Sequence, residues 1–258
     1  MNQRFVRYKD CENNIINYGI IEDDNIFQLD NAPWLVSSKT GKKLSLESVV
    51  LSAPVNPSKI ICIGLNYRAH VEASYSTDSL PEYPLIFLKP PSAIIGHEQH
   101  IVHPKQSERV DYEAELGVVI GKKAKNISEN QAEDFIFGFT CVNDVTARDL
   151  QKKDGQWSRA KGFDTFCPVG PWIVKNIDYP DVLVEGIVNK EIKQSGRTSS
   201  MIFKIPYLIS YLSSIMTLNP GDLIATGTPA GIAPMKAGDV IEIRIEQIGS
   251  LKNIIVKA

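Results

Sequence analysis

The strongest constraint in this sequence is a set of acidic residues at the start of an apolar strand, at residues 110–120 (VDYEAELGVVI). Side chains alternate faces along a strand, so Glu113 and Glu115 point the same way, with Asp111 on that face one step earlier. Aligned carboxylates that enter a core repel each other and lose hydration, and a bound cation offsets both effects. The apolar stretch at 116–120 favours burial over the alternative, a half-exposed edge strand whose acids face water.

A third acid, Asp144, follows a second apolar run and is placed to close the same site. The alternative interpretation is that Asp144 is an ordinary turn residue. Three carboxylates with no nearby sulfur favour a hard cation such as Mg²⁺ or Mn²⁺, whose remaining positions hold water or substrate oxygens. We therefore predict an oxygen-ligand metal centre formed by Glu113, Glu115 and Asp144.

Composition excludes several classes of function. The 258 residues are 43% hydrophobic and 22% charged, which is ordinary for a globular protein with a sizeable core. A formal net charge of −2 gives no basic field for nucleic acid or an anionic membrane. Neither a signal-peptide pattern nor a membrane-length apolar run is present, so we expect a cytoplasmic protein. Four widely spaced cysteines are expected to be reduced core residues, namely Cys11, Cys62, Cys141 and Cys167.

The chain divides at a proline-containing polar segment, residues 52–58 (SAPVNPS). Residues 1–56 alternate short apolar pieces with Asn and Asp, which predicts a small N-terminal β-region of antiparallel strands. Residues 57–258 form the predicted catalytic domain, which begins with a buried strand at 59–65. Residues 71–84 are polar and suit a mobile loop or lid. The predicted class is mixed, β-rich α+β with few short helices.

Two helices are indicated by local signals. Residues 128–131 (SENQ) have the spacing of a capping box, followed by Ala132, Phe135 and Ile136 as an apolar stripe. Pro206 suits a first helical turn, and apolar residues recur at helical spacing up to 216, before Asn-Pro-Gly at 219–221.

Further polar residues are candidates for chemistry. Thr146 is placed to cap a short helix on which Arg148 and Gln151 share a face. Lys161 either neutralises charge at an anionic site or extends to the surface. Thr228 lies in residues 226–231 (TGTPAG), which offer a hydroxyl and N–H groups to an anion or form only a turn. His70 leaves a buried strand and is the histidine we expect to act as acid or base.

The other three histidines, His97, His100 and His103, recur every third residue. Zinc uses histidine ligands, but this spacing in an extended segment flanked by Gly and Pro does not place the rings on one strand face. We expect an exposed loop, with a zinc site as the alternative.

The motifs together resemble the fumarylacetoacetate hydrolase family, from about residue 59 to the C-terminus. The resembling segments are 64–70 (GLNYRAH), 87–92 (FLKPPS), 111–116 (DYEAEL), 143–151 (NDVTARDLQ), 159–166 (RAKGFDTF) and 226–231 (TGTPAG). Each motif is weak singly, but their order and spacing are specific. Residues before 57 resemble only the small N-terminal β-region that many members carry.

The resemblance implies a β-roll or β-sandwich fold, usually dimeric, with one Mg²⁺ or Mn²⁺ per chain. By position it implies Glu113, Glu115 and Asp144 as metal ligands. It places Lys161 beside the substrate and the metal, and it makes His70 the acid or base on the lid. The substrate pocket would be lined by Arg148, Gln151 and Thr228. Tyr67 is a further expected substrate contact. Members act on 2-oxo or 1,3-dioxo acids by hydrolysis, decarboxylation or tautomerisation.

One departure bears on the reaction. Many relatives place a glutamate three residues after this histidine, where the chain has Ala73, with Glu72 one position earlier. Residues two apart on a helix face different sides, so Glu72 is poorly placed to pair with His70, although we retain it as a catalytic candidate. We expect a decarboxylase or isomerase of a small 2-oxo dicarboxylic acid, of the oxaloacetate or 2-hydroxyhepta-2,4-diene-1,7-dioate type. The alternatives are a C–C bond hydrolase and a non-catalytic metal-dependent acid-binding protein.

Overall fold

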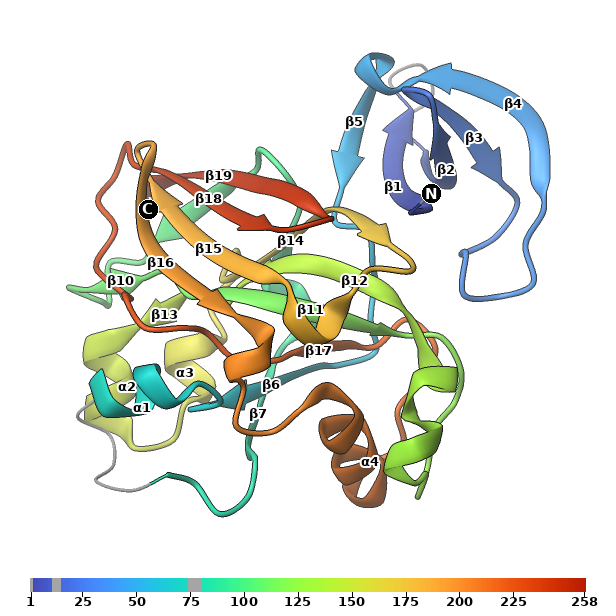
Figure 1. Cartoon of the computed structure of the whole chain (residues 1–258). Helices are drawn as coiled ribbons and strands as arrows, with labels where there is room; N and C mark the ends of the chain where they lie inside the picture. Colours follow the sequence, from blue (N-terminus) through green and yellow to red (C-terminus); the bar gives the residue numbers. More distant parts are fainter. Residues whose placement is uncertain (1, 11–14, 74–79) are drawn as a thin grey trace.

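The fold is described from a computed structural model, in which residues 2–10, 15–73 and 80–258 are placed. These residues form two large β-sheets with short helices around them (Figure 1). The predicted β-rich class with few helices and a small N-terminal β-region is confirmed. No helix among the placed residues is long and apolar enough to cross a lipid bilayer.

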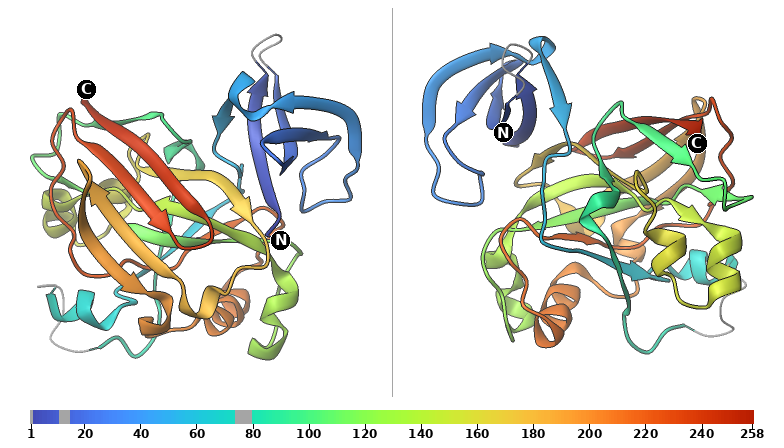
Figure 2. Two further views of the ribbon diagram at one scale, coloured as in Figure 1. Left: turned by 45° about the horizontal axis from the view of Figure 1, so that its top comes forward. Right: turned by 180° about the vertical axis from the view of Figure 1, so that it is seen from behind.

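The N-terminal strands lie to one side of the remaining strands in every view (Figures 1 and 2). They are β1 (Arg4–Asp10), β2 (Ile16–Glu22), β3 (Asn25–Leu29), β4 (Lys39–Ser45) and β5 (Val49–Ser52). All pair antiparallel, and Val6, Tyr8 and Ile26 form a small core of their own. β1 also pairs with a later strand, β14, through Arg4 and Phe5. The N-terminal region is thereby joined to the main sheet by backbone hydrogen bonds.

The main sheet continues in the order β14-β12-β11-β17-β6-β7. Its strands are β6 (Ile60–Gly64), β7 (Leu85–Lys89), β8 (Ile94–Ile95), β11 (Ala114–Ile120), β12 (Ile136–Asn143), β14 (Cys167–Val174) and β17 (Leu223–Ala225). Every residue of β11 is buried, because strands flank it on both sides and a second sheet covers it. The edge-strand alternative for the acidic segment is therefore wrong.

A second sheet of five strands, in the order β16-β15-β18-β19-β9, packs on the main sheet. Its strands are β9 (His100–His103), β15 (Leu183–Val188), β16 (Glu191–Arg197), β18 (Val240–Ile245) and β19 (Gly249–Lys257). Alternating burial along β18 sends Ile241, Ile243 and Ile245 into the main core, where Leu116 and Val118 of β11 also lie. The two layers thus form the predicted sandwich, and its core fixes β11 in place.

The helices are short. They are α1 (Arg68–Ala73), α2 (Arg148–Asp154), α3 (Ser158–Lys161) and α4 (Ile205–Ile215), with 3₁₀ turns η1 (Leu46–Ser48), η2 (Pro91–Ala93), η3 (Glu129–Phe135), η4 (Tyr179–Asp181) and η5 (Thr198–Ser200). The capping box at Ser128 is present, but it starts a 3₁₀ helix, and Ile136 begins a strand instead of extending the helix. Pro206 lies in the first turn of α4, as predicted.

Two other expectations are only partly met. The buried state of Cys62, Cys141 and Cys167 is confirmed, while Cys11 lies outside the described residues. The predicted lid at 71–84 begins within α1, and its residues 74–79 also lie outside them, so the lid stays a prediction.

The predicted loop around the histidines needs correction. His100 and His103 belong to β9, which pairs in parallel with β19, because the C-terminal strand offers a free edge that local sequence does not reveal. Among the placed residues, no group of His, Cys, Asp or Glu suited to a metal includes these histidines, so the zinc alternative has no support.

Candidate metal and active site

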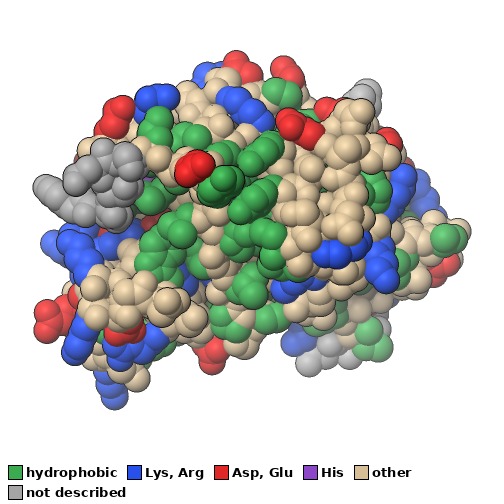
Figure 3. Space-filling view, turned by 90° about the horizontal axis from the view of Figure 1, so that it is seen from below, with side chains coloured by type: hydrophobic (Ala, Val, Ile, Leu, Met, Phe, Trp, Pro, Cys, Tyr) green, Lys and Arg blue, Asp and Glu red, His purple; other side chains and the backbone are tan. Residues whose placement is uncertain are grey.

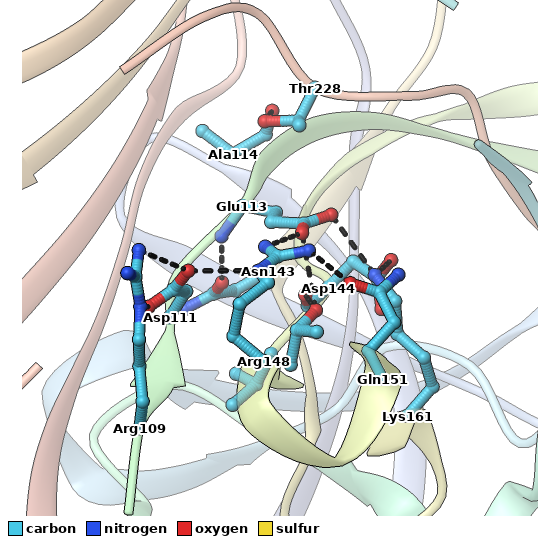
Figure 4. A network of polar contacts seen from close by, with 12 residues as sticks. Arg109, Asp111, Glu113, Ala114, Asn143, Asp144, Arg148, Gln151, Lys161 and Thr228 are labelled. Carbon is cyan, nitrogen blue, oxygen red and sulfur yellow. Dashed lines mark hydrogen bonds and ion pairs between the residues drawn. The ribbon is translucent and has the colours of Figure 1, made fainter. Parts of the chain in front are cut away.

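Three acids meet where β11 begins and β12 ends. Ala114 pairs with Asn143 across the ladder, and the Asp144 N–H donates to the Glu113 carbonyl at 2.9 Å. Ligand oxygens of Glu113, Glu115 and Asp144 lie within 4.8 Å of one another, and all three side chains are buried. The two-stranded ladder of β10 (Val110–Asp111) and β13 (Thr146–Ala147) holds the flanking segments together. The strand pairing of this sheet therefore assembles the carboxylate triad, and Figure 4 shows two of its members, Glu113 and Asp144.

Two buried lysines compensate this negative charge. Lys161, at the end of α3, places its Nζ 2.5 Å from Asp144 Oδ2 and 3.1 Å from Glu113 Oε2. Its side chain is only 2% exposed, so the surface-lysine alternative is wrong. Lys89 of β7 places its Nζ 2.6 Å from Asp144 Oδ1 and 3.0 Å from the Val145 carbonyl. Sequence reasoning gave Lys89 no role, although its segment was among the resembling motifs.

Glu113 and Glu115 differ sharply in their compensation. Burial raises the pKa of Glu113, but Lys161 and Arg148 outweigh burial and hold that pKa well below its usual range. Burial, reinforced by Asp144 and Glu113, raises the pKa of Glu115 well above its usual range. The one hydrogen bond that Glu115 receives from the placed residues comes from the Gly227 N–H at 2.8 Å. Glu115 is thus the acid whose negative charge a further cation would stabilise most.

This donor set fits a divalent ion. Carboxylate oxygens in a buried cluster are the ligands that Mg²⁺ and Mn²⁺ prefer. The Tyr67 hydroxyl, which is buried with no hydrogen-bond partner among the placed residues, lies close enough to Glu115 for the two to interact electrostatically. Burial and then Glu115 raise the pKa of Tyr67. Tyr67 is therefore a buried donor with no acceptor among the placed residues, near the acid of the triad that has the least compensation.

Arg148 organises the side of the triad nearest α2. Its Nε donates to Asp111 Oδ2 at 2.9 Å, its Nη1 donates to Gln151 Oε1 at 2.5 Å, and its Nη2 contacts Glu113 Oε1. The predicted shared helical face of Arg148 and Gln151 is therefore present. Thr146 does not cap the helix, because its hydroxyl bonds the Asp144 carbonyl at 2.9 Å, and Ala147 takes the cap position.

A cavity of about 620 Å³ opens onto the triad. Eight of the ten residues expected from sequence line it, namely His70, Glu113, Glu115, Asp144, Arg148, Gln151, Lys161 and Thr228. Phe87 and Trp157 supply aromatic walls, with the Lys161 Nζ 4.9 Å from the Phe87 ring centroid. Burial, followed by the nearby cations Arg148 and Lys161, lowers the pKa of His70, against an opposing effect of Glu113.

The two remaining candidates do not reach the cavity. Glu72 is exposed on α1 and is not among the lining residues, whereas Ala73 is. The expected participation of Glu72 therefore needs correction, because the helical turn carries it away from the cavity wall that His70 faces. Tyr67 is buried behind the wall, where its backbone bridges to Met201.

Thr228 owes its position to a residue that sequence reasoning missed. The Thr228 hydroxyl donates to the Ala114 carbonyl at 2.9 Å and accepts from Gln194 Nε2 at 2.8 Å. Gln194 also accepts the Ala114 N–H at 2.9 Å. A glutamine in an otherwise polar strand carries no local signal for this role; the signal is its burial, which appears only when the two sheets pack.

The Lys89–Asp144 pair leads to a stability prediction. Lys89→Met leaves a carboxylate buried with one cation fewer, and we expect a loss of about 3 kcal/mol in the free energy of unfolding, at the low end because Lys161 remains. Urea denaturation measures it. Lys122→Met, at an exposed turn, is the control and should change stability by less than about 0.5 kcal/mol. Equal stability of the two variants would mean that Lys89 does not compensate Asp144.

Comparison with known proteins agrees with this geometry. The family model "Fumarylacetoacetate (FAA) hydrolase C-terminal" matches residues 59–256, and "Rv2993c-like, N-terminal" matches residues 3–54. The chain is 48% identical over 222 residues to oxaloacetate tautomerase YisK of Bacillus subtilis, which covers 81% of this chain and 74% of the relative.

Solved structures extend the likeness over the whole chain. A 2-hydroxyhepta-2,4-diene-1,7-dioate isomerase from Mycobacterium marinum matches at 42% identity and a TM-score of 0.91, over 99% of this chain and 98% of its own. A maleylpyruvate hydrolase from Sphingobium, in complex with manganese (II) ion and pyruvate, matches at 30% identity and a TM-score of 0.80, over 99% of both chains. Sequence and structure together show that this chain belongs to the fumarylacetoacetate hydrolase family of enzymes.

Proposed function

We propose that this enzyme interconverts the keto and enol forms of a small 2-oxo dicarboxylic acid such as oxaloacetate. The observation that carries the proposal is the position of His70 and its hydrogen bonding. Its ring lies buried in the cavity beside the triad, and it hydrogen-bonds no carboxylate among the placed residues. Moving a proton between carbon and a base needs one such imidazole, whereas hydrolysis also needs an activated water.

The family is metal-dependent, and this chain has a buried acid triad to match. We propose that Glu113, Glu115 and Asp144 hold one Mg²⁺ or Mn²⁺. When bound, such an ion polarises the 2-oxo group and stabilises the negative charge of an enolate.

The side chains of this protein account for the remaining requirements. His70, kept neutral by its lowered pKa, takes the proton from the carbon next to the ketone and delivers it to the enolate oxygen, which forms the enol; on the reverse path it carries the proton back to carbon. Lys161 supplies positive charge next to Glu113 and Asp144, where the enolate oxygen develops. Gln151 offers its amide N–H groups to the substrate from the wall, and Phe87 and Trp157 exclude water. Thr228 lines the same wall, with its hydroxyl hydrogen donated to the Ala114 carbonyl.

The same enolate chemistry serves neighbouring reactions. Loss of the distal carboxylate of oxaloacetate as CO₂ leaves the enolate of pyruvate, whose negative charge the same site would stabilise, and one relative of this fold is named as a maleylpyruvate hydrolase. Ala73 lines the cavity at the position where a glutamate would assist His70 in activating water. Because no carboxylate among the placed residues hydrogen-bonds His70, proton transfer is favoured over hydrolysis.

The function is tested with a substrate panel of oxaloacetate, acetylpyruvate and 2-hydroxyhepta-2,4-diene-1,7-dioate, with added Mn²⁺. We expect rapid ketonisation of enol-oxaloacetate, followed by its ultraviolet absorbance, and a loss of about a hundredfold or more in kcat for His70→Asn. His100→Asn, at an exposed strand position, is the control and should leave kcat unchanged. Cleavage of acetylpyruvate alone would establish a hydrolase, and tight oxalate binding without any turnover would establish a binding protein.

The pH profile adds an independent check on His70. Because the pKa of His70 is lowered, the neutral base persists as pH falls, and it is protonated only below the ordinary imidazole range near ~6.5. The acidic limb of kcat/KM should therefore lie below that range.

We infer that the enzyme associates with a second copy of itself through the face that carries β7 and α4. β7 is the last strand of its sheet, so its outer edge has no strand partner among the placed residues, and Leu85 and Leu88 on it are exposed. Figure 3 shows hydrophobic side chains gathered on the side of the molecule that is seen from below. Tyr83, shortly before β7, and Ile215, the last residue of α4, are also exposed. An apolar sheet edge of this kind is normally covered.

Light scattering after size-exclusion chromatography tests this association. We expect the parent to have the mass of a dimer, and Leu88→Arg to have the mass of a monomer because a charge is buried at the contact. Val36→Arg, at an exposed position in the N-terminal region, should keep the parent's mass. A parent with monomer mass, or a dimeric Leu88→Arg, would contradict the inference.

A further inference from the structure

Arg109 is a cavity residue that neither the sequence motifs nor the reaction outlined above uses. It precedes β10 and lines the cavity wall. Its Nε donates to Asp111 Oδ1 at 2.8 Å and its Nη2 donates to Asp111 Oδ2 at 3.1 Å. Asp111 is fully buried and holds the guanidinium in a bidentate grip. Arg109 is therefore a cation whose orientation is fixed by Asp111 and whose side chain is partly exposed at the cavity wall.

The guanidinium of the neighbouring Arg148 already donates hydrogen bonds within the protein. All three nitrogens of Arg148 donate to protein acceptors, on Asp111, Gln151 and Glu113. Arg109, by contrast, uses only its Nε and Nη2, and its Nη1 has no acceptor among the placed residues. The Arg109 side chain is 45% exposed, against 12% for Arg148. Of the two guanidinium groups in the cavity wall, Arg109 is therefore the more available to an added anion.

The placement of Arg109 relative to the triad suits a substrate with two negative ends. Arg109 and Arg148 share the carboxylate of Asp111, and Arg148 contacts Glu113 of the triad. Figure 4 shows Arg109 and Lys161 on opposite sides of Arg148, with the triad acids Glu113 and Asp144 between them. The triad acids and Lys161, which contacts two of them, therefore form one end of the site, and the available guanidinium of Arg109 forms the other.

We propose that Arg109 binds the distal carboxylate of the substrate and makes this enzyme selective for 2-oxo dicarboxylic acids over monocarboxylic ones. The proposal rests on the reaction proposed above, whose 2-oxo carboxylate end lies at the triad. A guanidinium forms two parallel hydrogen bonds or a forked contact with a carboxylate, and a guanidinium already oriented by Asp111 loses little freedom on binding. Because Arg109 is partly exposed, solvent limits its effect to about tenfold in affinity.

The alternative role for Arg109 is structural, as a partner that keeps Asp111 in place. A structural role would affect every ligand alike. Selectivity is therefore measured with two pairs of compounds that differ only at the distal end: oxaloacetate with its 4-methyl ester, and the unreactive analogue malate with its 4-methyl ester.

The decisive variant is Arg109→Met, which keeps the length of the side chain and removes its charge. For oxaloacetate we expect KM to rise about tenfold, with a much smaller change in kcat, while KM for the ester stays the same. Arg109→Lys should recover part of the loss. Arg159→Met is the matched control, because Arg159 is equally exposed and grips Asp154 in the same bidentate way outside the cavity. It should change neither value.

Calorimetric titration of the Mn²⁺-loaded enzyme with malate and its ester separates this proposal from the proposed reaction. The parent should bind malate about tenfold more tightly than the ester, and Arg109→Met should bind both equally. If that preference is found without turnover of oxaloacetate, the proposed reaction fails and the role of Arg109 stands. If the parent does not distinguish the two, or if Arg109→Met retains the preference, the role of Arg109 is overturned.

Discussion

Mutual repulsion among three carboxylates, held within 4.8 Å of one another and removed from water, is the constraint on which the rest of the site depends. Such a cluster persists only where cations offset it. Lys161 and Lys89 reach Asp144 from two elements, α3 and β7, and Arg148 reaches Glu113 from α2. Elements far apart in the sequence are therefore joined at the triad by charge as well as by packing.

The cationic side chains of the protein offset the negative charges of the three acids unequally, and this difference determines the chemistry of the site. Glu113 and Asp144 each have a lysine within reach, whereas the hydrogen bond that Glu115 receives within the described part of the chain is a backbone N–H from Gly227. A divalent ion held by the triad would stabilise Glu115, whose pKa burial and the two neighbouring acids raise. The same ion would draw a 2-oxo acid into the cavity that His70 faces. Stability of the fold and the proposed reaction thus depend on the same set of charges.

Local patterns in the sequence predicted much of this arrangement. Alternation along a strand placed Glu113 and Glu115 on one face, and helical spacing placed Arg148 beside Gln151, because both signals depend only on near neighbours. The β-rich class and the helix beginning near Pro206 follow from equally local signals. The family resemblance supplied the expected roles for Lys161 and Thr228, which the residues alone left open.

The features that sequence reasoning missed depend on contacts between distant segments. Lys89 ends an edge strand and looks like a surface lysine until Asp144, 55 positions later, comes within 2.6 Å. The strand that contains His100 and His103 forms only because β19 offers it an edge. Gln194 gains its role when the second sheet covers the first. None of these partners can be read from neighbouring residues.

Equilibrium binding of Mn²⁺ to the purified protein, by calorimetry and elemental analysis, tests the central claim most directly. The account predicts one ion per chain for the parent and at least about a tenfold weaker affinity for Glu115→Gln, which removes the charge while keeping the shape. Glu47→Gln, at an exposed position in the N-terminal region, should bind as the parent does. A parent that takes up no stoichiometric Mn²⁺, or a Glu115→Gln variant with the parent's affinity, would contradict it.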